Sequence, residues 1–124
     1  MAAQDNKQTA KQGYEAFGRG DAEGAMATIS DSVEWVVPGD SALSGVYRGK
    51  EEVGGLWAQI GEKDFRTEPR EFLADGDKVV VLTTYSIGSD KAQVVDIASY
   101  DSSGKLARFE AYGGEALFDR HFPK

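Results

Sequence analysis

Apolar residues recur with helical spacing in three segments of the first half of the chain, at residues 5–18, 22–29 and 53–60. Each segment shows the i, i+3, i+4, i+7 type of stripe that is typical of an amphipathic helix. Gly18 ends the first helix, and Asp21 is placed to cap the second. The stripes consist of Ala10, Tyr14 and Phe17; of Ala22, Ala25, Met26 and Ile29; and of Val53, Leu56, Trp57 and Ile60.

The pattern changes to extended structure elsewhere in the chain. Alternation at residues 33–37 predicts one strand before the third helix, and everything after residue 61 looks extended. Short Gly, Asp and Ser clusters read as hairpin turns between four long strands. These strands are expected at about residues 64–74, 78–87, 92–100 and 105–112. Helices followed by hairpin-linked strands predict an α+β fold with an antiparallel sheet.

The third of these long strands is apolar on both faces. Val94 and Ala98 flank Asp96 on one face, whereas Val95 and Ile97 lie on the other. An unpaired ionised carboxylate in such a setting costs several kcal/mol, so Asp96 must be protonated, paired or hydrogen-bonded. One face needs helices and the other needs a second cover, which predicts a homodimer through the sheet.

Composition narrows the range of partners. The 124 residues suit a single domain spanning residues 1–124, and 14 Lys and Arg against 21 Asp and Glu give a net charge of −7. No basic cluster offsets this charge, so nucleic acid and anionic membranes are not expected partners. The first residues lack the apolar core of a secretory signal, and the interpretation is a cytoplasmic protein. With no Cys and one His, neither a metal site nor a cofactor is expected.

Two sets of segments, taken in order, resemble the nuclear transport factor 2-like superfamily, which includes ketosteroid isomerases and the SnoaL-like polyketide cyclases. The first set is similar to the SnoaL-like N-terminal half, and the second resembles the last two strands of ketosteroid isomerases. They are residues 14–21, 31–35 and 45–53, and then Val95-Asp96-Ile97, Gly104, Glu110-Ala111-Tyr112 and Glu115. The resemblance covers nearly the whole chain and implies a cone-shaped, curved sheet with the three helices on its concave side.

The resemblance assigns roles to Asp96 and Tyr14. In ketosteroid isomerases an Asp eight residues before the turn Gly donates a hydrogen bond to the substrate oxyanion, and Asp96 matches it. An Asp is a donor at neutral pH only if desolvation raises its pKa. The alternative is a structural Asp paired with a cation or the backbone. The family's second donor is a helix Tyr at the spacing that Gly13 holds here, so Tyr14, one residue late, is either a ligand donor or a core residue.

The family's acids and bases do not appear at their usual places. Ketosteroid isomerases carry a general base at the end of the first strand, where this chain has Trp35, Val36 or Val37, none of which accepts a proton. SnoaL-like cyclases resemble one another in an Asp after the last-strand Tyr, but a Gly pair follows Tyr112 here.

Three other side chains are the nearest substitutes for a base. Glu115 is expected to cap the closing turn, and Asp40 lies in a polar loop, so solvated roles are favoured for both. His121 is interpreted as an exposed tail residue.

Aromatic and small residues from several elements can still converge on an apolar pocket, with Gly113 leaving space where isomerases often carry a bulky aromatic. The expected ligand-binding residues are Phe17, Trp35, Val37, Trp57, Tyr85, Phe109 and Gly113. The hypothesis is a protein that binds a small apolar molecule, with an isomerase or cyclase of carbonyl-containing apolar substrates as its enzymatic form. The alternative is a non-catalytic ligand-binding or protein-interaction module that has lost the base, so the sequence leaves open whether the protein is an enzyme.

Overall fold

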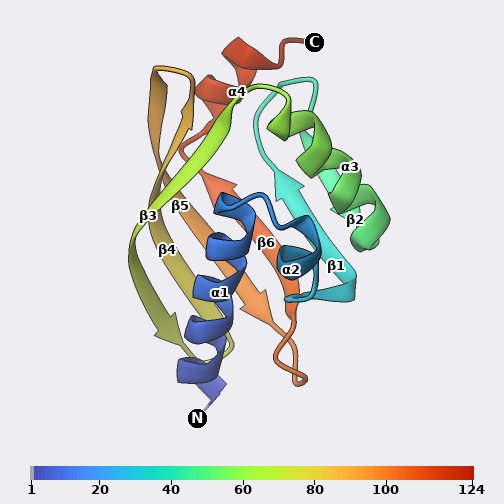
Figure 1. Ribbon diagram of the computed structural model, residues 1–124, viewed down its shortest axis with the longest axis vertical. Coiled ribbons are helices and arrows are strands. Elements are labelled where there is room, and N and C mark those ends of the chain that lie inside the picture. Colours follow the sequence, from blue (N-terminus) through green and yellow to red (C-terminus); the bar gives the residue numbers. More distant parts are fainter. Residues whose placement is uncertain (1) are drawn as a thin grey trace.

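The computed structural model describes residues 2–124 and shows an unclosed, curved six-stranded sheet with helices on one side (Figure 1). The elements are α1 (Ala2–Gly18), α2 (Ala22–Met26), β1 (Ile29–Val37), β2 (Gly45–Arg48), α3 (Gly49–Gly61), β3 (Phe65–Asp75), β4 (Lys78–Ile87), β5 (Asp90–Tyr100), β6 (Leu106–Tyr112) and α4 (Glu115–His121). The predicted α+β architecture is confirmed. Within residues 2–124, no helix is long and apolar enough to cross a membrane.

The sheet is mixed, whereas the sequence predicted an antiparallel one. Its strand order is β2-β1-β6-β5-β4-β3, and β3 to β6 form an antiparallel meander. β1, however, pairs with β6 in parallel. No hairpin connects these two strands, because β2, α3 and strands β3 to β5 lie between them in the chain. Turn composition therefore carries no information about their relative direction.

Two short elements were missed by the sequence pattern. The four residues of β2 include no buried side chain, so no alternation marks them. α4 corrects the expectation that everything after residue 61 is extended, and it buries Leu117 and Phe118. A seven-residue helix spans about two turns, which is too short for a periodic stripe to stand out.

Local signals position the N-terminal helices as expected. α1 ends at Gly18, and the chain then reverses through Gly20, whose φ is +78°. The Asp21 side chain caps α2 by accepting a hydrogen bond from the Gly24 N–H at 2.9 Å. These two features bring α1 and α2 side by side over the sheet.

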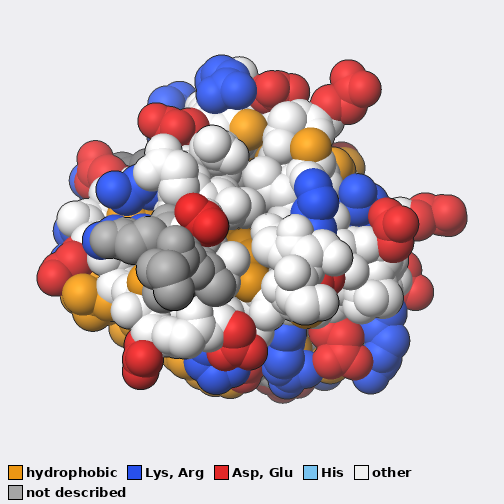
Figure 2. All heavy atoms as spheres, turned by 90° about the horizontal axis from the view of Figure 1, so that it is seen from below, with side chains coloured by type: hydrophobic (Ala, Val, Ile, Leu, Met, Phe, Trp, Pro, Cys, Tyr) orange, Lys and Arg blue, Asp and Glu red, His pale blue; other side chains and the backbone are white. Residues whose placement is uncertain are grey.

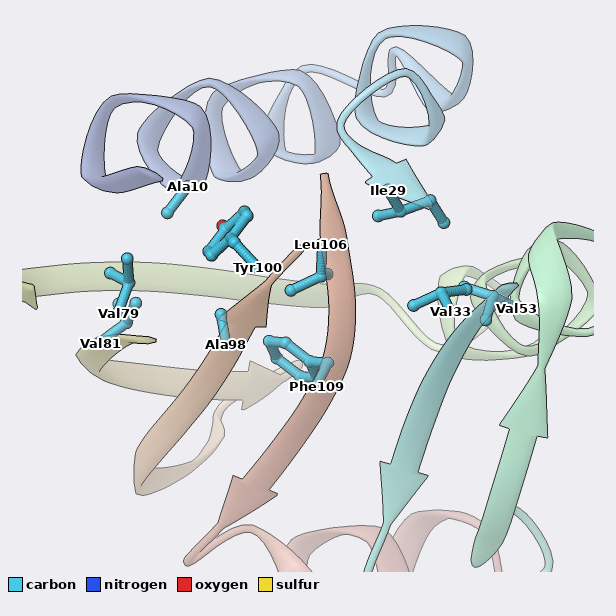
Figure 3. Close-up of a cluster of buried hydrophobic side chains, with 10 residues drawn as sticks. All are labelled: Ala10, Ile29, Val33, Val53, Val79, Val81, Ala98, Tyr100, Leu106 and Phe109. Atoms are coloured by element: carbon cyan, nitrogen blue, oxygen red, sulfur yellow. The ribbon is translucent and has the colours of Figure 1, made fainter. Parts of the chain in front are cut away.

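The core lies between α1 and the concave face of the sheet (Figure 3). Ala10 points from α1 toward Val79 and Val81 of β4, both fully buried. Tyr100 of β5 and Phe109 of β6 extend the same layer toward β1. This packing fixes α1 over β3 and β4.

The turn from β6 into α4 depends on Gly113. Its φ is +109°, and a Cβ there would lie 2.4 Å from the backbone oxygen of Gln93. We predict that Gly113→Ala lowers the free energy of unfolding by about 1–3 kcal/mol, because strain and a backbone clash combine. Urea denaturation measures the loss.

Gly76→Ala is the matched control, since Gly76 also has a positive φ, +62°, but open space around its Cβ position. Its loss should be clearly smaller, from backbone strain alone. Equal losses for the two variants would show that the close approach to Gln93 is unimportant.

Candidate ligand-binding site

A cavity of about 110 Å³ lies between the helices and the concave face of the sheet. Its walls are predominantly apolar, and aromatic rings from α1, β1, α3, β3, β4 and β6 form a large part of them. The ring-bearing residues that form them include Phe17, Trp35, Trp57, Phe65, Tyr85 and Phe109. A concave, apolar space with few polar groups is the usual form of a small-molecule site.

Aromatic packing holds these walls in place. Trp35 and Phe109 are register partners of the parallel β1–β6 pair, and their rings stack with centroids 3.8 Å apart at 20°. Trp57 of α3 meets Trp35 edge-to-face at 5.5 Å, and Phe17 of α1 meets Trp57 in the same way. Edge-to-face pairs add about 0.5–1.5 kcal/mol each beyond burial. The walls are therefore rigid elements of the fold.

One carboxyl group lies in this apolar lining. Asp96 of β5 is 0% exposed and lines the cavity together with Tyr14 and Tyr85. The Tyr14 hydroxyl donates to Oδ2 of Asp96, and the Tyr85 hydroxyl donates to Oδ1 at 2.6 Å. α1, β4 and β5 thus each supply one member of what we call the Tyr–Asp–Tyr cluster, Tyr14, Asp96 and Tyr85.

Burial controls the protonation of this cluster. Desolvation raises the pKa of Asp96 to about 7, although the two phenol hydrogen bonds oppose the shift. Desolvation and the neighbouring Asp96 hold the pKa of Tyr14 and of Tyr85 well above the ordinary value, so both phenols keep their hydrogens at neutral pH. Within the described part of the chain, the hydrogen-bond partners of the Asp96 carboxyl are these phenols and include no Lys or Arg.

The structure brings Tyr14 to Asp96 in spite of its one-residue offset from the family spacing. α1 presents both Gly13 and Tyr14 to the cavity. A Cβ at Gly13 would lie 3.3 Å from Oγ1 of Thr28, so a larger residue at that position would press on the Thr28 side chain just before β1. The helix therefore supplies the phenol from the next position.

Sequence reasoning placed Tyr85 in the pocket but missed its hydrogen bond to Asp96. The signal was the two-residue turn Gly88-Ser89, which fixes the β4–β5 register. In that register Tyr85 pairs with Ala92 and Asp96 pairs with Val81, so both side chains lie on the same face. Counting outward from the turn would have found the pair.

The other expected pocket residues divide into two groups. Gly113 does not line the cavity. It has no Cβ because the backbone of Gln93 occupies the space where a Cβ would lie. Its neighbour Gly114 lines the cavity instead and lies against the ring of Tyr85. The residues that the structure places along the cavity as expected are Phe17, Trp35, Val37, Trp57, Tyr85 and Phe109.

The candidate bases lie in different surroundings. Glu115 lines the cavity, and it also accepts a hydrogen bond from the Gly113 N–H at 2.6 Å. Asp40 is exposed and pairs with Lys124 at 2.6 Å, away from the cavity. Glu115 is therefore the one of these groups that a cavity ligand could meet.

His121 is not in an exposed tail, as the sequence had suggested. It belongs to α4, its side chain is mostly buried, and its Nε2 lies 3.0 Å from Oδ2 of Asp90. Arg120 bonds the same carboxylate and, with His121, lowers the pKa of Asp90. Residues 2–124 contain no cluster of three His, Asp or Glu side chains that could hold a metal ion.

A second groove of about 950 Å³, lined by polar and apolar residues alike, runs along α1 and α2. Its other wall consists of the turns at residues 76–77 and 101–105, and its α1 side extends from Asp5 to Arg19. Figure 2 views the molecule from below and shows acidic and basic side chains mainly around the edge of this face. Tyr100 and Thr28 line both the groove and the cavity, so they form the wall between the two.

The raised pKa of Asp96 has a defined effect on stability. Between about pH 4 and pH 7 the unfolded chain ionises this carboxyl while the folded chain keeps it protonated. The stabilising contribution of Asp96 is thus fully present below about pH 4 and is lost as the pH rises through about 7. We predict that the free energy of unfolding of Asp96→Asn, relative to that of the wild type, rises by on the order of 4 kcal/mol between pH 4 and pH 8. Urea unfolding of both proteins across this range measures the difference, and a constant difference would contradict a buried, neutral carboxyl.

Comparison with known proteins agrees with this architecture. Among solved structures, a nuclear transport factor 2-like protein of unknown function from Burkholderia pseudomallei is 26% identical, with a TM-score of 0.84 over 97% of this chain and 98% of that one. A protein of unknown function with a cystatin-like fold from Xanthomonas campestris is 24% identical, with a TM-score of 0.82 over 92% and 94% of the two chains, and shows the same fold.

A third similar structure was co-crystallised with a small molecule. TerC, co-crystallised with polyporic acid, is 26% identical, with a TM-score of 0.82 over 94% of this chain and 96% of that one. None of the curated protein sequences matches this chain at a significant level. The SnoaL-like domain, in contrast, matches residues 10–109, and the chain belongs to this SnoaL-like family within the nuclear transport factor 2-like superfamily.

Proposed function

We propose that this protein binds a small, largely apolar molecule in the aromatic cavity, with the Tyr–Asp–Tyr cluster as its polar anchor. The observation that carries the proposal is the position of Asp96, which is fully buried, borders the cavity and bonds only phenols among the described residues. A carboxyl with a merely structural role in an apolar interior is normally paired with a cation. A ligand oxygen or hydroxyl is a natural additional partner for such a cluster.

The similarity to TerC supports the same proposal at a coarser level. TerC is a related fold that was crystallised with polyporic acid, an organic small molecule. The cavity of this chain, about 110 Å³, is smaller than the roughly 150 Å³ engineered cavity known to hold benzene. We therefore propose ligands that present a single ring to the cluster.

A second candidate function is an isomerase or cyclase acting on a carbonyl-containing apolar substrate, and the position of Glu115 favours it. This carboxylate lines the cavity and uses one oxygen for the Gly113 N–H, which leaves the other free to accept a proton. The non-catalytic form of the proposal is favoured by Trp35 and Val37, which occupy the place of the family's usual base.

We also propose that the protein forms a homodimer through the outer face of its sheet. Large apolar side chains remain exposed there on four strands, and an exposed apolar patch on a sheet is typical of an interface. These side chains are Val46 of β2, Leu73 of β3, Val95 of β5 and Tyr112 of β6.

Filling the cavity should abolish ligand binding. Ala111 lines the cavity and pairs with Asp96 across β5 and β6. We predict that toluene quenches or shifts the fluorescence of Trp35 and Trp57 in the wild type, and that Ala111→Leu weakens this binding at least tenfold because the new side chain occupies the ligand's space. Ala42→Leu, at an exposed loop position, is the matched control and should bind normally. Equal binding by both variants would place the ligand elsewhere.

The dimer has its own test. Val95→Asp introduces a charge in the middle of the outer face and should shift sedimentation at micromolar concentration from dimer to monomer. Ser102→Asp, in the exposed turn after β5, should leave the dimer intact. A wild-type monomer at these concentrations would remove the proposed interface.

A further inference from the structure

We propose that the cavity continues past the Tyr–Asp–Tyr cluster to a second polar point, the hydroxyl groups of Tyr100 and Thr28, and that this point binds an alcohol at the end of an unbranched chain. The ligand is then a ring that carries an apolar chain with a terminal hydroxyl. This inference rests on the proposed function, because it requires that the cavity holds a small molecule. It deepens that function by naming the chemistry of the ligand's far end.

A passage leads from the cluster along β5 to Tyr100. Asp96, Ala98 and Tyr100 all line the cavity, and they lie on the same face of β5 because side chains alternate along a strand. Figure 3 shows Ala98 and Tyr100 on the side of the strand that faces α1. The strand rise places the Cα atoms of Asp96 and Tyr100 about 13 Å apart. The cavity therefore extends well beyond the cluster.

Small residues line this part of the cavity. They come from three elements, and each has a single side-chain carbon or none: Ala10 and Gly13 of α1, Ala25 of α2 and Ala98 of β5. The other part of the cavity has aromatic walls, which suit a flat ring. The space between small side chains suits an unbranched chain instead.

The Tyr100 hydroxyl is a buried polar group that has no hydrogen-bond partner among the described residues. Tyr100 is 6% exposed and borders both the cavity and the groove. Within residues 2–124, Oγ1 of Thr83 is the one fully enclosed side-chain atom that lacks a partner, so the Tyr100 oxygen touches open space. Burial raises the pKa of Tyr100, and the phenol thus keeps its hydrogen at neutral pH. A ligand oxygen would satisfy this donor.

Thr28 supplies an acceptor in the same wall. Its hydroxyl donates to the carbonyl oxygen of Ala25 at 2.7 Å, which leaves the Thr28 oxygen able to accept a hydrogen. This oxygen lies close to α1, since a Cβ at Gly13 would be 3.3 Å from it. An alcohol both donates and accepts, so it can use Tyr100 and Thr28 together, whereas a ketone or an ether can use the phenol alone.

The ring of such a ligand stays in the aromatic part of the cavity. Phe17, Trp57 and Phe65 line that part and are only partly buried, so the cavity opens toward solvent there. Phe17 meets both other rings edge-to-face, at 5.5 Å and 6.2 Å. A ring held at this opening remains partly in solvent, and the whole ligand does not have to fit into the enclosed volume of about 110 Å³.

The experiment measures Kd values by protein NMR titration for phenylethanol, phenylpropanol and phenylbutanol, and for the alkylbenzenes in which a methyl group replaces each hydroxyl. Toluene reports on the aromatic part alone. Tyr100→Phe removes one oxygen and keeps the ring. We expect it to raise the Kd of at least one of the alcohols about five- to tenfold, the usual effect of one lost neutral hydrogen bond. The Kd values of toluene and the alkylbenzenes should change by less than about twofold.

Tyr47→Phe is the matched control. It deletes a phenol oxygen that donates to the carbonyl oxygen of Leu43 at 2.7 Å, and Tyr47 is not among the residues that line the cavity. The alcohols should bind this variant as they bind the wild type. Ala98→Val narrows the passage and should weaken the binding of phenylbutanol more than that of toluene. In the wild type, nuclear Overhauser effects should connect the methylene group beside the ligand hydroxyl to the ring of Tyr100.

The outcomes separate the inference from the proposed function. If toluene binds but Tyr100→Phe leaves the Kd of all three alcohols unchanged, the inference is wrong and the apolar site stands. An alcohol that loses affinity in Asp96→Asn but not in Tyr100→Phe places its hydroxyl at the cluster, which also overturns the inference. If neither toluene nor any alcohol binds, the proposed function fails and the inference fails with it. The contacts to Tyr100 in the wild type decide the matter even if Tyr100→Phe does not fold.

Discussion

The carboxyl group of Asp96 lies in the interior of the protein with two phenols as its hydrogen-bond partners. Removing a carboxylate from water is expensive, and phenols compensate an ionised carboxylate only in part. The folded protein therefore holds Asp96 close to the point where it is half protonated, with a pKa of about 7. That balance sets the electrostatics of the cavity and the dependence of stability on pH.

The fold brings together three segments that are distant in the sequence. α1 delivers Tyr14, the β4–β5 hairpin sets Tyr85 and Asp96 on one face, and the parallel β1–β6 pair stacks Trp35 on Phe109. Each of these parts belongs to a regular element that is fixed by core packing, so the site is preorganised. The walls supply apolar contact area and the cluster supplies polarity, which is the usual division of work in a small-molecule site.

Much of this arrangement could be predicted from the sequence, and the parts that could not have physical reasons. Helical stripes, turn clusters and the isolated Asp96 in an apolar strand located the long elements and the buried carboxyl, because periodicity reports which side chains are buried. The parallel pairing of β1 with β6 and the elements β2 and α4 were missed, because short segments and non-hairpin pairings leave little periodic signal. Gly113 was assigned to the pocket from its small size, but its positive φ and its approach to Gln93 explain the residue by backbone geometry.

Asp96 is a buried carboxyl whose pKa lies near 7. A ¹³C NMR titration of its side-chain carboxyl carbon tests this most directly. In the unliganded wild type the carbon should titrate with a midpoint near pH 7, about three pH units above an ordinary Asp. The chemical shift below the midpoint should be that of a protonated carboxyl. A midpoint at or below pH 4 would show an ionised carboxylate that the two phenols satisfy completely, and it would contradict the account.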